Sequence, residues 1–164
     1  MSKDEDADPE SLARTIALRM LERQPRTRVE LERALVRRGV PAEAAASVLD
    51  RFTEVGLVDD EAFATAWVDS RHVGRGLARR ALSAELRQRG VDEQIVRDAV
   101  GAVSADDEEA AARALATRRL PSMARLPRDT QVRRMVGILA RKGFSQGLAM
   151  KVIREVLADA AMRP

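Results

Sequence analysis

The sequence predicts an all-α protein made of three tandem three-helix repeats. The first observation behind this prediction is a glycine that recurs at Gly39, Gly90 and Gly143, at intervals of 51 and 53 residues. The second is that apolar residues keep fixed places around these glycines. The third is that no stretch alternates apolar and polar residues as a half-buried strand does. Self-similarity at this period is typical of helical-repeat proteins, so we expect helix-turn-helix-like units in an elongated, curved array.

The spacing around each glycine predicts two helices joined by a tight turn. The aligned apolar positions are Leu31, Leu82 and Met135, then Leu35, Leu86 and Leu139, then Val40, Val91 and Phe144, and finally Leu49, Val100 and Ile153. An apolar pair at positions i and i+4 lies on one face of a helix, so an amphipathic helix precedes each glycine. Glycine tolerates the left-handed backbone that ends many helices. Residues suited to a helix start follow two positions later: Pro41, Asp92 and Ser145.

A further helix precedes each of these pairs. Residues 12–23 place apolar side chains among charged ones, and Thr27 with Glu30 then predicts a capping box for the next helix. Residues 60–72 and 106–118 each open with acidic side chains, which stabilise a helix N-terminus. Each repeat is therefore predicted to contain three helices.

The predicted domains follow from this pattern. An acidic leader, residues 1–10, carries five acids and one lysine and is expected to be disordered. The three repeats are expected to occupy residues 11–56, 57–104 and 105–159, followed by a tail at 160–164.

The connections within the repeats differ in composition. Residues 72–76, with two glycines and an arginine, predict a flexible basic loop between the first two helices of the middle repeat. Residues 120–127 contain two prolines and predict a stiffer connection in the last repeat. Gly56 is expected to end the last helix of the first repeat.

The composition excludes several classes of protein. The chain has 164 residues and a formal net charge of +3, with no cysteine and one histidine. These counts exclude disulfides, thiolate nucleophiles and metal sites built on several Cys or His ligands. Three Phe and one Trp are too few to fill a core and also stack bases. We therefore expect no catalytic, cofactor-binding or metal-binding residues and no small-molecule substrate.

Two local motifs resemble catalytic or cofactor sites, but neither has the residues and spacing that such a site requires. Gly74-Arg75-Gly76 begins like a dinucleotide-binding loop, but Arg79 stands where the third glycine is required and no strand precedes it. Asp69, Ser70 and His72 are neighbours in sequence, whereas the members of a catalytic triad converge from separate parts of a chain. A basic hinge and a solvated helix end are the favoured interpretations.

The acidic run Asp59-Asp60-Glu61 admits two interpretations. Its carboxylates suit a divalent cation, and they equally suit a helix N-terminus. The recurrence of an acidic opening at Asp106 favours the helix N-terminus.

The small net charge conceals a strong segregation of charge. The net charges are −4 for residues 1–10, +5 for 11–38, −6 for 39–70, +5 for 71–90, −6 for 91–109, +8 for 110–142 and +1 for 143–164. All but three of the 29 basic residues are arginines, whose guanidinium groups match phosphate and carboxylate geometry. A GC-rich genome would also favour arginine, but it would not segregate the charge.

Two of the basic blocks supply the candidate binding residues. Glu85 is the one acid within residues 71–90, and Asp129 is the one acid within residues 110–142. The predicted binding residues are Arg71, Arg75, Arg79, Arg80, Arg87, Arg89, Arg118, Arg119, Arg133, Arg134, Arg141 and Lys142.

Several short motifs follow one another at distinctive spacing. They are Val55-Gly56-Leu57-Val58-Asp59-Asp60 followed by Phe63-Ala64, Arg71 with Gly74 and Gly76, Glu85-Leu86-Arg87-Gln88-Arg89-Gly90-Val91, and Leu139-Ala140-Arg141-Lys142-Gly143-Phe144. In order and spacing they resemble the RecX family of recombination regulators, over about residues 11–158. Pro41 departs from the polar residue usual at that place, and this departure leaves the resemblance unchanged.

The resemblance implies a non-enzymatic inhibitor of the RecA recombinase. Proteins of this family are three-helix repeat modules that bind the RecA–DNA filament and suppress its ATPase, strand-exchange and coprotease activities. The implied partners are the RecA filament and the DNA phosphate backbone within it, with effects on DNA repair, recombination and the SOS response. The resemblance assigns no catalytic residue, and Arg71 and Arg141 fall within matched motifs of the second and third repeats.

The sequence also suggests where the protein acts and in what state. No apolar run approaches the roughly 20 residues of a membrane-spanning helix, so we expect a cytoplasmic protein that does not bind membranes. We also expect it to be a monomer. The alternative function is a stand-alone helix-turn-helix DNA-binding protein, because helix pairs joined at a glycine turn also occur in transcription factors.

Overall fold

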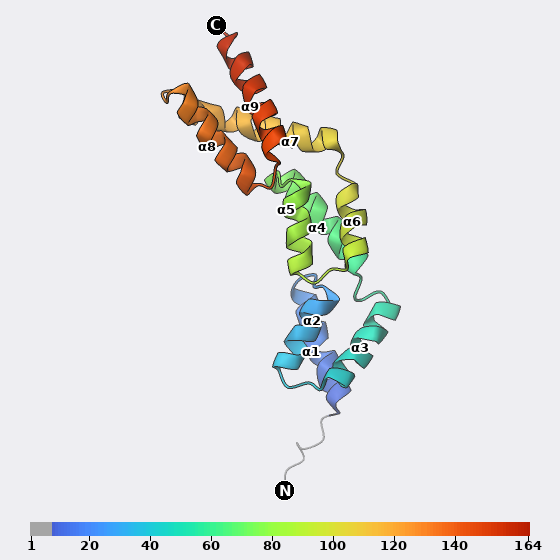
Figure 1. Ribbon diagram of the computed structural model, residues 1–164. Coiled ribbons are helices and arrows are strands. Elements are labelled where there is room, and N and C mark those ends of the chain that lie inside the picture. Colours follow the sequence, from blue (N-terminus) through green and yellow to red (C-terminus); the bar gives the residue numbers. More distant parts are fainter. Residues whose placement is uncertain (1–7) are drawn as a thin grey trace. The chain divides into compact units, whose positions relative to one another are not determined.

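The computed structural model describes residues 8–164, which form nine α-helices and one short 3₁₀ helix (Figure 1). The elements are α1 (Pro9–Arg23), α2 (Arg28–Arg37), α3 (Ala42–Glu54), α4 (Asp60–Arg75), α5 (Arg79–Gln88), α6 (Glu93–Gly101), α7 (Ala105–Arg119), η1 (Leu120–Met123), α8 (Arg128–Arg141) and α9 (Gln146–Ala161). No strand occurs in this part of the chain. The all-α prediction, with three helices in each repeat, is confirmed.

The predicted boundaries of the two termini need correction. Helix α1 begins at Pro9, so the last two residues of the predicted disordered leader, 1–10, are helical. The Ser11 hydroxyl donates to the Asp8 carboxylate (3.0 Å), and proline at the first helical position has a pre-set backbone angle. Residues 1–7 of that leader lie outside the described residues. At the other end, α9 runs to Ala161, two residues into the predicted tail, 160–164.

The predicted basic loop at residues 72–76 is wrong, because α4 continues through Arg75. Of the two glycines in this segment, only Gly76 has a positive φ, of 63°, whereas Gly74 lies within the helix. The amide of Gly76 donates to the His72 carbonyl (2.9 Å), and Nδ1 of His72 lies 2.9 Å from the Leu77 carbonyl oxygen. The helix end is therefore a hydrogen-bonded turn of Gly76 to Ala78, not a five-residue loop.

The glycines that define the repeat end the second helix of each repeat, as predicted. Gly39, Gly90 and Gly143 have φ values of 84°, 83° and 91°. The apolar residue after each glycine is buried and its amide donates back to the helix, for example from Val40 to the Leu35 carbonyl (3.1 Å). Local sequence signals therefore specify these turns.

Helix starts also follow the sequence signals. Thr27 and Glu30 form the predicted capping box at the start of α2. Ser104 and Asp107 form a second box at the start of α7, and Ser145 caps α9 by accepting from the Leu148 amide (3.2 Å).

The chain divides into two compact units. The first holds residues up to Thr65 together with Leu86–Val96, and the second holds Ala66–Glu85 together with Arg97–Pro164. Helices α4, α5 and α6 therefore each contribute residues to both units, so neither unit matches a whole number of repeats.

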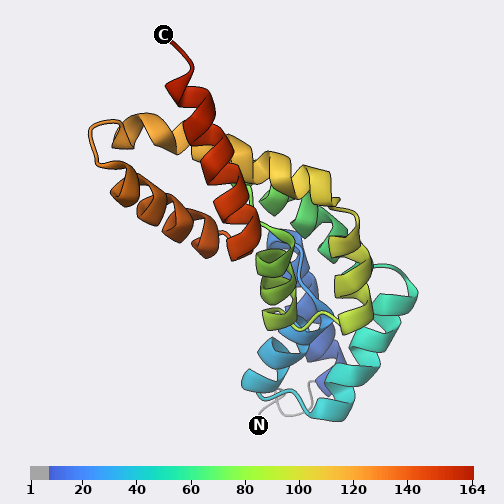
Figure 2. The same cartoon turned by 45° about the horizontal axis from the view of Figure 1, so that its top comes forward.

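Each unit has its own apolar core. In the first unit α3 packs against α1 and α2, and Leu31, Leu49 and Phe52 are buried there. In the second unit α9 packs against α7 and α8 (Figure 2), and Met135 and Ile153 are buried there.

Candidate functional site

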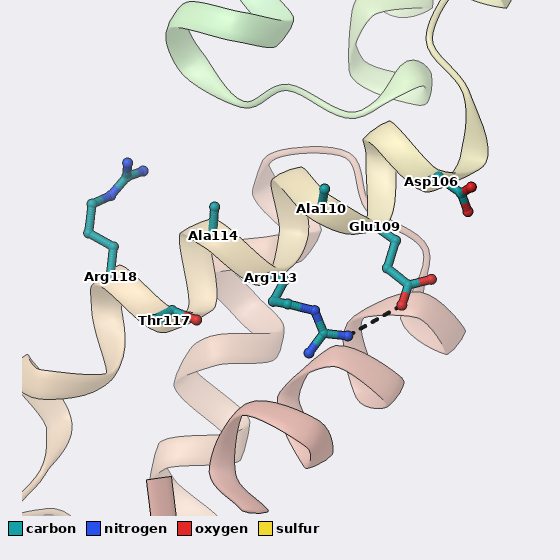
Figure 3. Close-up of a pocket in the computed structure, with 7 residues that line it drawn as sticks. All are labelled: Asp106, Glu109, Ala110, Arg113, Ala114, Thr117 and Arg118. Carbon is teal, nitrogen blue, oxygen red and sulfur yellow. Dashed lines mark hydrogen bonds and ion pairs between the residues drawn. The ribbon is translucent and has the colours of Figure 1, made fainter. Parts of the chain in front are cut away.

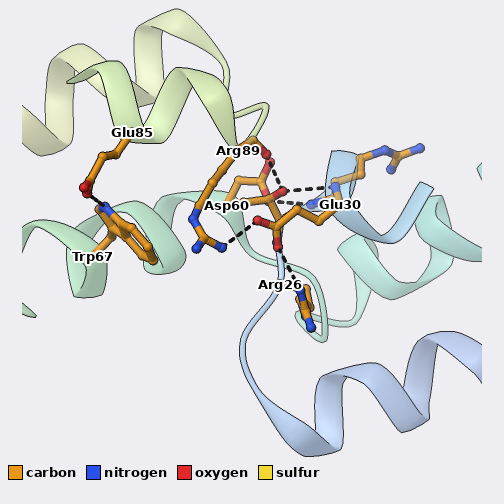
Figure 4. Close-up of polar contacts among 8 residues, drawn as sticks. Arg26, Glu30, Asp60, Trp67, Glu85 and Arg89 are labelled. Carbon is orange, nitrogen blue, oxygen red and sulfur yellow. Dashed lines mark hydrogen bonds and ion pairs between the residues drawn. The ribbon is translucent and has the colours of Figure 1, made fainter. Parts of the chain in front are cut away.

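Three of the twelve predicted binding residues are neutralised within the chain. Arg79 donates through Nε to Glu108 Oε2 (2.6 Å). Arg87 donates to both carboxylate oxygens of Glu93 (2.8 and 2.7 Å). Arg89 donates to Glu30 Oε1 (2.7 Å; Figure 4). The charges of these arginines are therefore largely balanced before any partner binds.

The pair between Arg79 and Glu108 joins α5 to α7. Glu108 is only 8% exposed, and it is the one buried charged residue among the described residues. Removing Arg79 would leave the Glu108 carboxylate without its partner in a poorly hydrated place, which is strongly destabilising. Arg79 is thus a structural residue in this fold, whatever else it contacts.

Arg71 lies over an aromatic ring. Its guanidinium carbon is 4.2 Å from the ring centroid of Trp67, and Trp67 Nε1 donates to Glu85 Oε2 (2.8 Å; Figure 4). The ring orients the guanidinium group, and the residue as a whole is partly buried. Lys142, another predicted residue, donates through Nζ to the Arg75 carbonyl (3.2 Å).

The remaining seven predicted residues are exposed and form no ion pair within residues 8–164. We call them the unpaired arginines: Arg75, Arg80, Arg118, Arg119, Arg133, Arg134 and Arg141. All seven belong to the second compact unit. The sequence did not single out two more exposed arginines of the same basic block, Arg125 and Arg128, which also lack an ion pair in the described chain. The charge of these side chains is available to a partner.

A shallow hollow on α7 is occupied by ion pairs. Arg113 contacts Glu109 (3.3 Å) on its own helix and Glu155 on α9, and Lys151 of α9 also reaches Glu109 (3.1 Å). Hydrogen bonds from Lys151 and Arg113 lower the pKa of Glu109, and Glu155 raises the pKa of Arg113. Figure 3 shows Arg118 extending away from this cluster. The ion pairs in this hollow therefore hold α7 against α9, whereas the Arg118 side chain remains available to a partner.

The acidic run at the start of α4 serves helix termini. Asp59 Oδ1 accepts from the Ala62 amide (3.0 Å), so the interpretation as a helix N-terminus is confirmed. Asp60 has a role that the sequence did not indicate: its Oδ1 accepts from the amide of Arg28 (2.9 Å), the first residue of α2. Among residues 8–164, no group of three or more His, Asp or Glu side chains is arranged to hold a metal ion.

Substituting Asp60 tests this capping contact. Burial raises the pKa of Asp60 above its ordinary value of 3.8, although the Arg28 amide and guanidinium act in the opposite direction. Below that ordinary value the carboxyl is protonated in both the folded and the unfolded chain. As the pH rises through the raised pKa of the folded state, the wild-type chain therefore loses stability. At low pH we expect Asp60→Asn to unfold at the same temperature as the wild type. At pH 7 we expect it to unfold at a higher temperature than the wild type.

The matched control is Asp60→Ala, which removes the acceptor. It is expected to destabilise the chain by about 1 kcal/mol. Thermal unfolding followed by circular dichroism between pH 3 and 7 measures both variants, and an Asn variant less stable than wild type at neutral pH would contradict the expectation.

None of the helices in the described part of the chain combines the length and apolar character needed to cross a bilayer.

Comparisons with known proteins agree with the three-repeat organisation. Family models described as the first, second and third three-helix domains of RecX match residues 13–52, 59–100 and 106–153. A curated protein named regulatory protein RecX from Thermobifida fusca is 59% identical over 154 residues, which cover 92% of this chain and 83% of that protein. Its namesake from Streptomyces coelicolor is 51% identical over 152 residues, covering 93% and 81% of the two chains.

Solved structures show the same fold. A crystal structure of RecX from Lactobacillus salivarius superposes with a TM-score of 0.82 at 21% identity, covering 92% of this chain and 98% of that one. A second, of a regulatory protein RecX, gives a TM-score of 0.79 at 23% identity, covering 91% and 73%. With three matched domains and relatives above 50% identity along most of its length, the chain belongs to the RecX family of regulatory proteins.

Proposed function

We propose that this chain is a non-enzymatic cytoplasmic regulator that binds the RecA–DNA filament and inhibits RecA ATPase, strand-exchange and coprotease activity. It would thereby modulate DNA repair, recombination and the SOS response. Membership of the RecX family supports a regulatory role. The observation that carries the proposal is the set of seven exposed, unpaired arginines on helices α4, α5, α7 and α8.

The chemistry of these arginines fits a phosphate-bearing partner. A guanidinium group without an internal carboxylate keeps its donors for phosphate oxygens, which it binds in a bidentate fork. Each phosphate contact also releases a condensed counterion, so binding should weaken steeply with salt. In our working scheme the basic faces at 71–90 and 113–142 contact DNA phosphates and acidic RecA surface. The acidic faces at 43–61 and 92–109 contact basic RecA surface.

The distribution of charge among the helices favours this function over a stand-alone DNA-binding protein. In a helix-turn-helix protein the helix after the turn enters the major groove. Here those helices are acidic or neutral: α3 carries three acids and one arginine, α6 two acids and one arginine, and α9 two acids and two bases. The net positive charge lies instead on the helices before the glycine turns, α2, α5 and α8.

A RecA ATPase assay tests the proposal. RecA filaments on single-stranded DNA are expected to lose ATP hydrolysis as the chain is added, with binding to the filaments much tighter than to naked DNA. Normal hydrolysis at saturating chain would contradict the proposal. Tight, sequence-specific binding to bare duplex without an effect on RecA would favour the alternative.

A further inference from the structure

A glycine inside α8 has no explanation in the backbone or in the packing of other helices. Gly137 lies one turn before the end of the helix, where glycine is among the least favourable residues. Its φ is not positive, and no atom of another helix is among the three nearest to a Cβ placed there. Those three atoms all belong to the guanidinium group of Arg141, with Nη1 at 3.3 Å. The missing side chain therefore leaves room for an arginine.

Gly137 lies between two of the unpaired arginines on one face of α8. Arg134 precedes it by three residues and Arg141 follows it by four, and residues at these spacings are neighbours on a helix surface. Arg141 folds back over Gly137, in the direction in which helical side chains lean. The one acid of the helix, Asp129, lies in its first turn. Between the two arginines the helix surface thus carries no side chain of its own.

The exposed face of α8 has the composition of a surface that binds nucleic acid. Its exposed residues beyond the first turn are Arg133, Arg134, Ala140 and Arg141. None of the large exposed apolar side chains of residues 8–164 lies on this helix. Interfaces between proteins are built around apolar and aromatic anchors. Contacts to a phosphate backbone instead use arginine and a strongly positive, polar surface.

A hollow beside this face adds another unpaired arginine. It has a volume of about 650 Å³, lies between α5 and α8, and is lined by Arg80 and by small side chains that include Ala84 and Ala140. No acidic residue is among those that line it. Positive charge therefore borders the hollow on α5 as well as along α8, which suits an extended phosphate chain better than a single anion.

We propose that Arg134, Gly137 and Arg141 form a binding site for the phosphate backbone of a nucleic-acid strand. A phosphate group lies against α8 where Gly137 has no side chain, and it accepts hydrogen bonds from the guanidinium groups on either side. The strand continues past the hollow to Arg80. This proposal rests on the proposed function for its partner, the DNA of the filament. It adds which residues receive the phosphate chain and why one of them is a glycine.

Filling the space at Gly137 tests the proposal without changing any charge. Gly137→Leu places a side chain between the two arginines and is expected to weaken binding of a single-stranded DNA oligonucleotide about fivefold at about 0.1 M salt, the contribution of one phosphate contact. The slope of log K against log salt should fall by about 0.7. Leucine favours a helix more than glycine does, so the variant should unfold at the wild-type temperature or above it. Gly137→Gln, which is similarly large but polar, is expected to bind as weakly.

The matched control is Gly101→Leu, at the last residue of α6, where a Cβ would meet no atom within 4 Å. It is expected to bind the oligonucleotide like the wild type. Wild-type affinity and slope in both Gly137 variants would overturn the proposal, and so would an equal loss in the Gly101 control. A wild-type chain that does not bind the oligonucleotide at about 50 mM salt would overturn it too.

The oligonucleotide is used without RecA, so the two proposals can fail separately. Absence of RecA inhibition in the ATPase assay would contradict the proposed function and leave this measurement unaffected. Normal DNA binding by the Gly137 variants together with weaker RecA inhibition would assign the exposed face of α8 to a protein contact, which overturns the phosphate site and leaves the proposed function standing.

Discussion

Gly143→Ala is expected to lower the unfolding temperature of the chain by about 4–20 °C. Alanine at a positive φ costs about 1–2 kcal/mol, and forcing an extra methyl group into a packed contact costs about 1–3 kcal/mol more. At this chain length each kcal/mol corresponds to about 2–4 °C. Two of the atoms that the new Cβ would meet, the amide nitrogen and Cα of Ala81, belong to the backbone of α5 and cannot rotate away.

The same substitution at Gly39 provides the control. Gly39 has nearly the same φ, 84° against 91°, but open space where the Cβ would be. Gly39→Ala should therefore cost only the backbone term, about 1–2 kcal/mol. Urea and thermal unfolding followed by circular dichroism measure both. Equal losses for the two variants would show that the junction contact at Ala81 adds nothing to stability.

These glycines show what sequence reasoning reaches and where it stops. Their positive φ values were predictable, because helix termination at glycine depends on local backbone geometry. Their different surroundings were not, because the contacts of Gly90 and Gly143 come from another repeat. The sequence pattern at Gly39 is the same, yet none of residues 8–164 packs where its Cβ would be.

The one wrongly predicted connection, residues 72–76, has a physical cause of the same kind. Two glycines and an arginine suggest a loop, but a glycine in the last turn of a helix costs only about 1 kcal/mol. Hydrogen bonds beyond the helix, from the amides of Gly76 and Leu77 back to α4, offset that cost. The composition of a short segment therefore could not decide where α4 ends.

Pairing of charges was also beyond the sequence. Arg79 and Glu108 are 29 residues apart, and Arg89 and Glu30 are 59 residues apart, so only the fold brings them together. Counting charge along the chain treats Arg79 and Arg80 alike, although one holds a buried carboxylate and the other is exposed and unpaired in the described chain. Reversing Arg79 to test binding would therefore confound binding with stability.

The unpaired arginines of α8 provide a cleaner test of function. We expect the triple variant R133Q/R134Q/R141Q to inhibit RecA ATPase about 10²–10³-fold less potently at about 0.1 M salt, which is the counterion-release contribution of three phosphate contacts. All three side chains are exposed on one helix and hold no carboxylate within residues 8–164. Glutamine keeps a similar helix propensity, so the fold should be retained.

The slope of affinity against salt distinguishes phosphate contacts from a general effect of charge. Each lost contact should reduce the slope of log K against log salt by about 0.7–0.9, so the triple variant should lose about 2–3 units. The control R14Q/R19Q/R23Q removes three exposed arginines from α1, and with them the same net charge. If α8 supplies phosphate contacts, only the α8 variant should inhibit RecA less potently and also show a smaller salt slope. If the two variants weaken equally with unchanged slopes, the positive charge acts at long range and α8 is not the binding face.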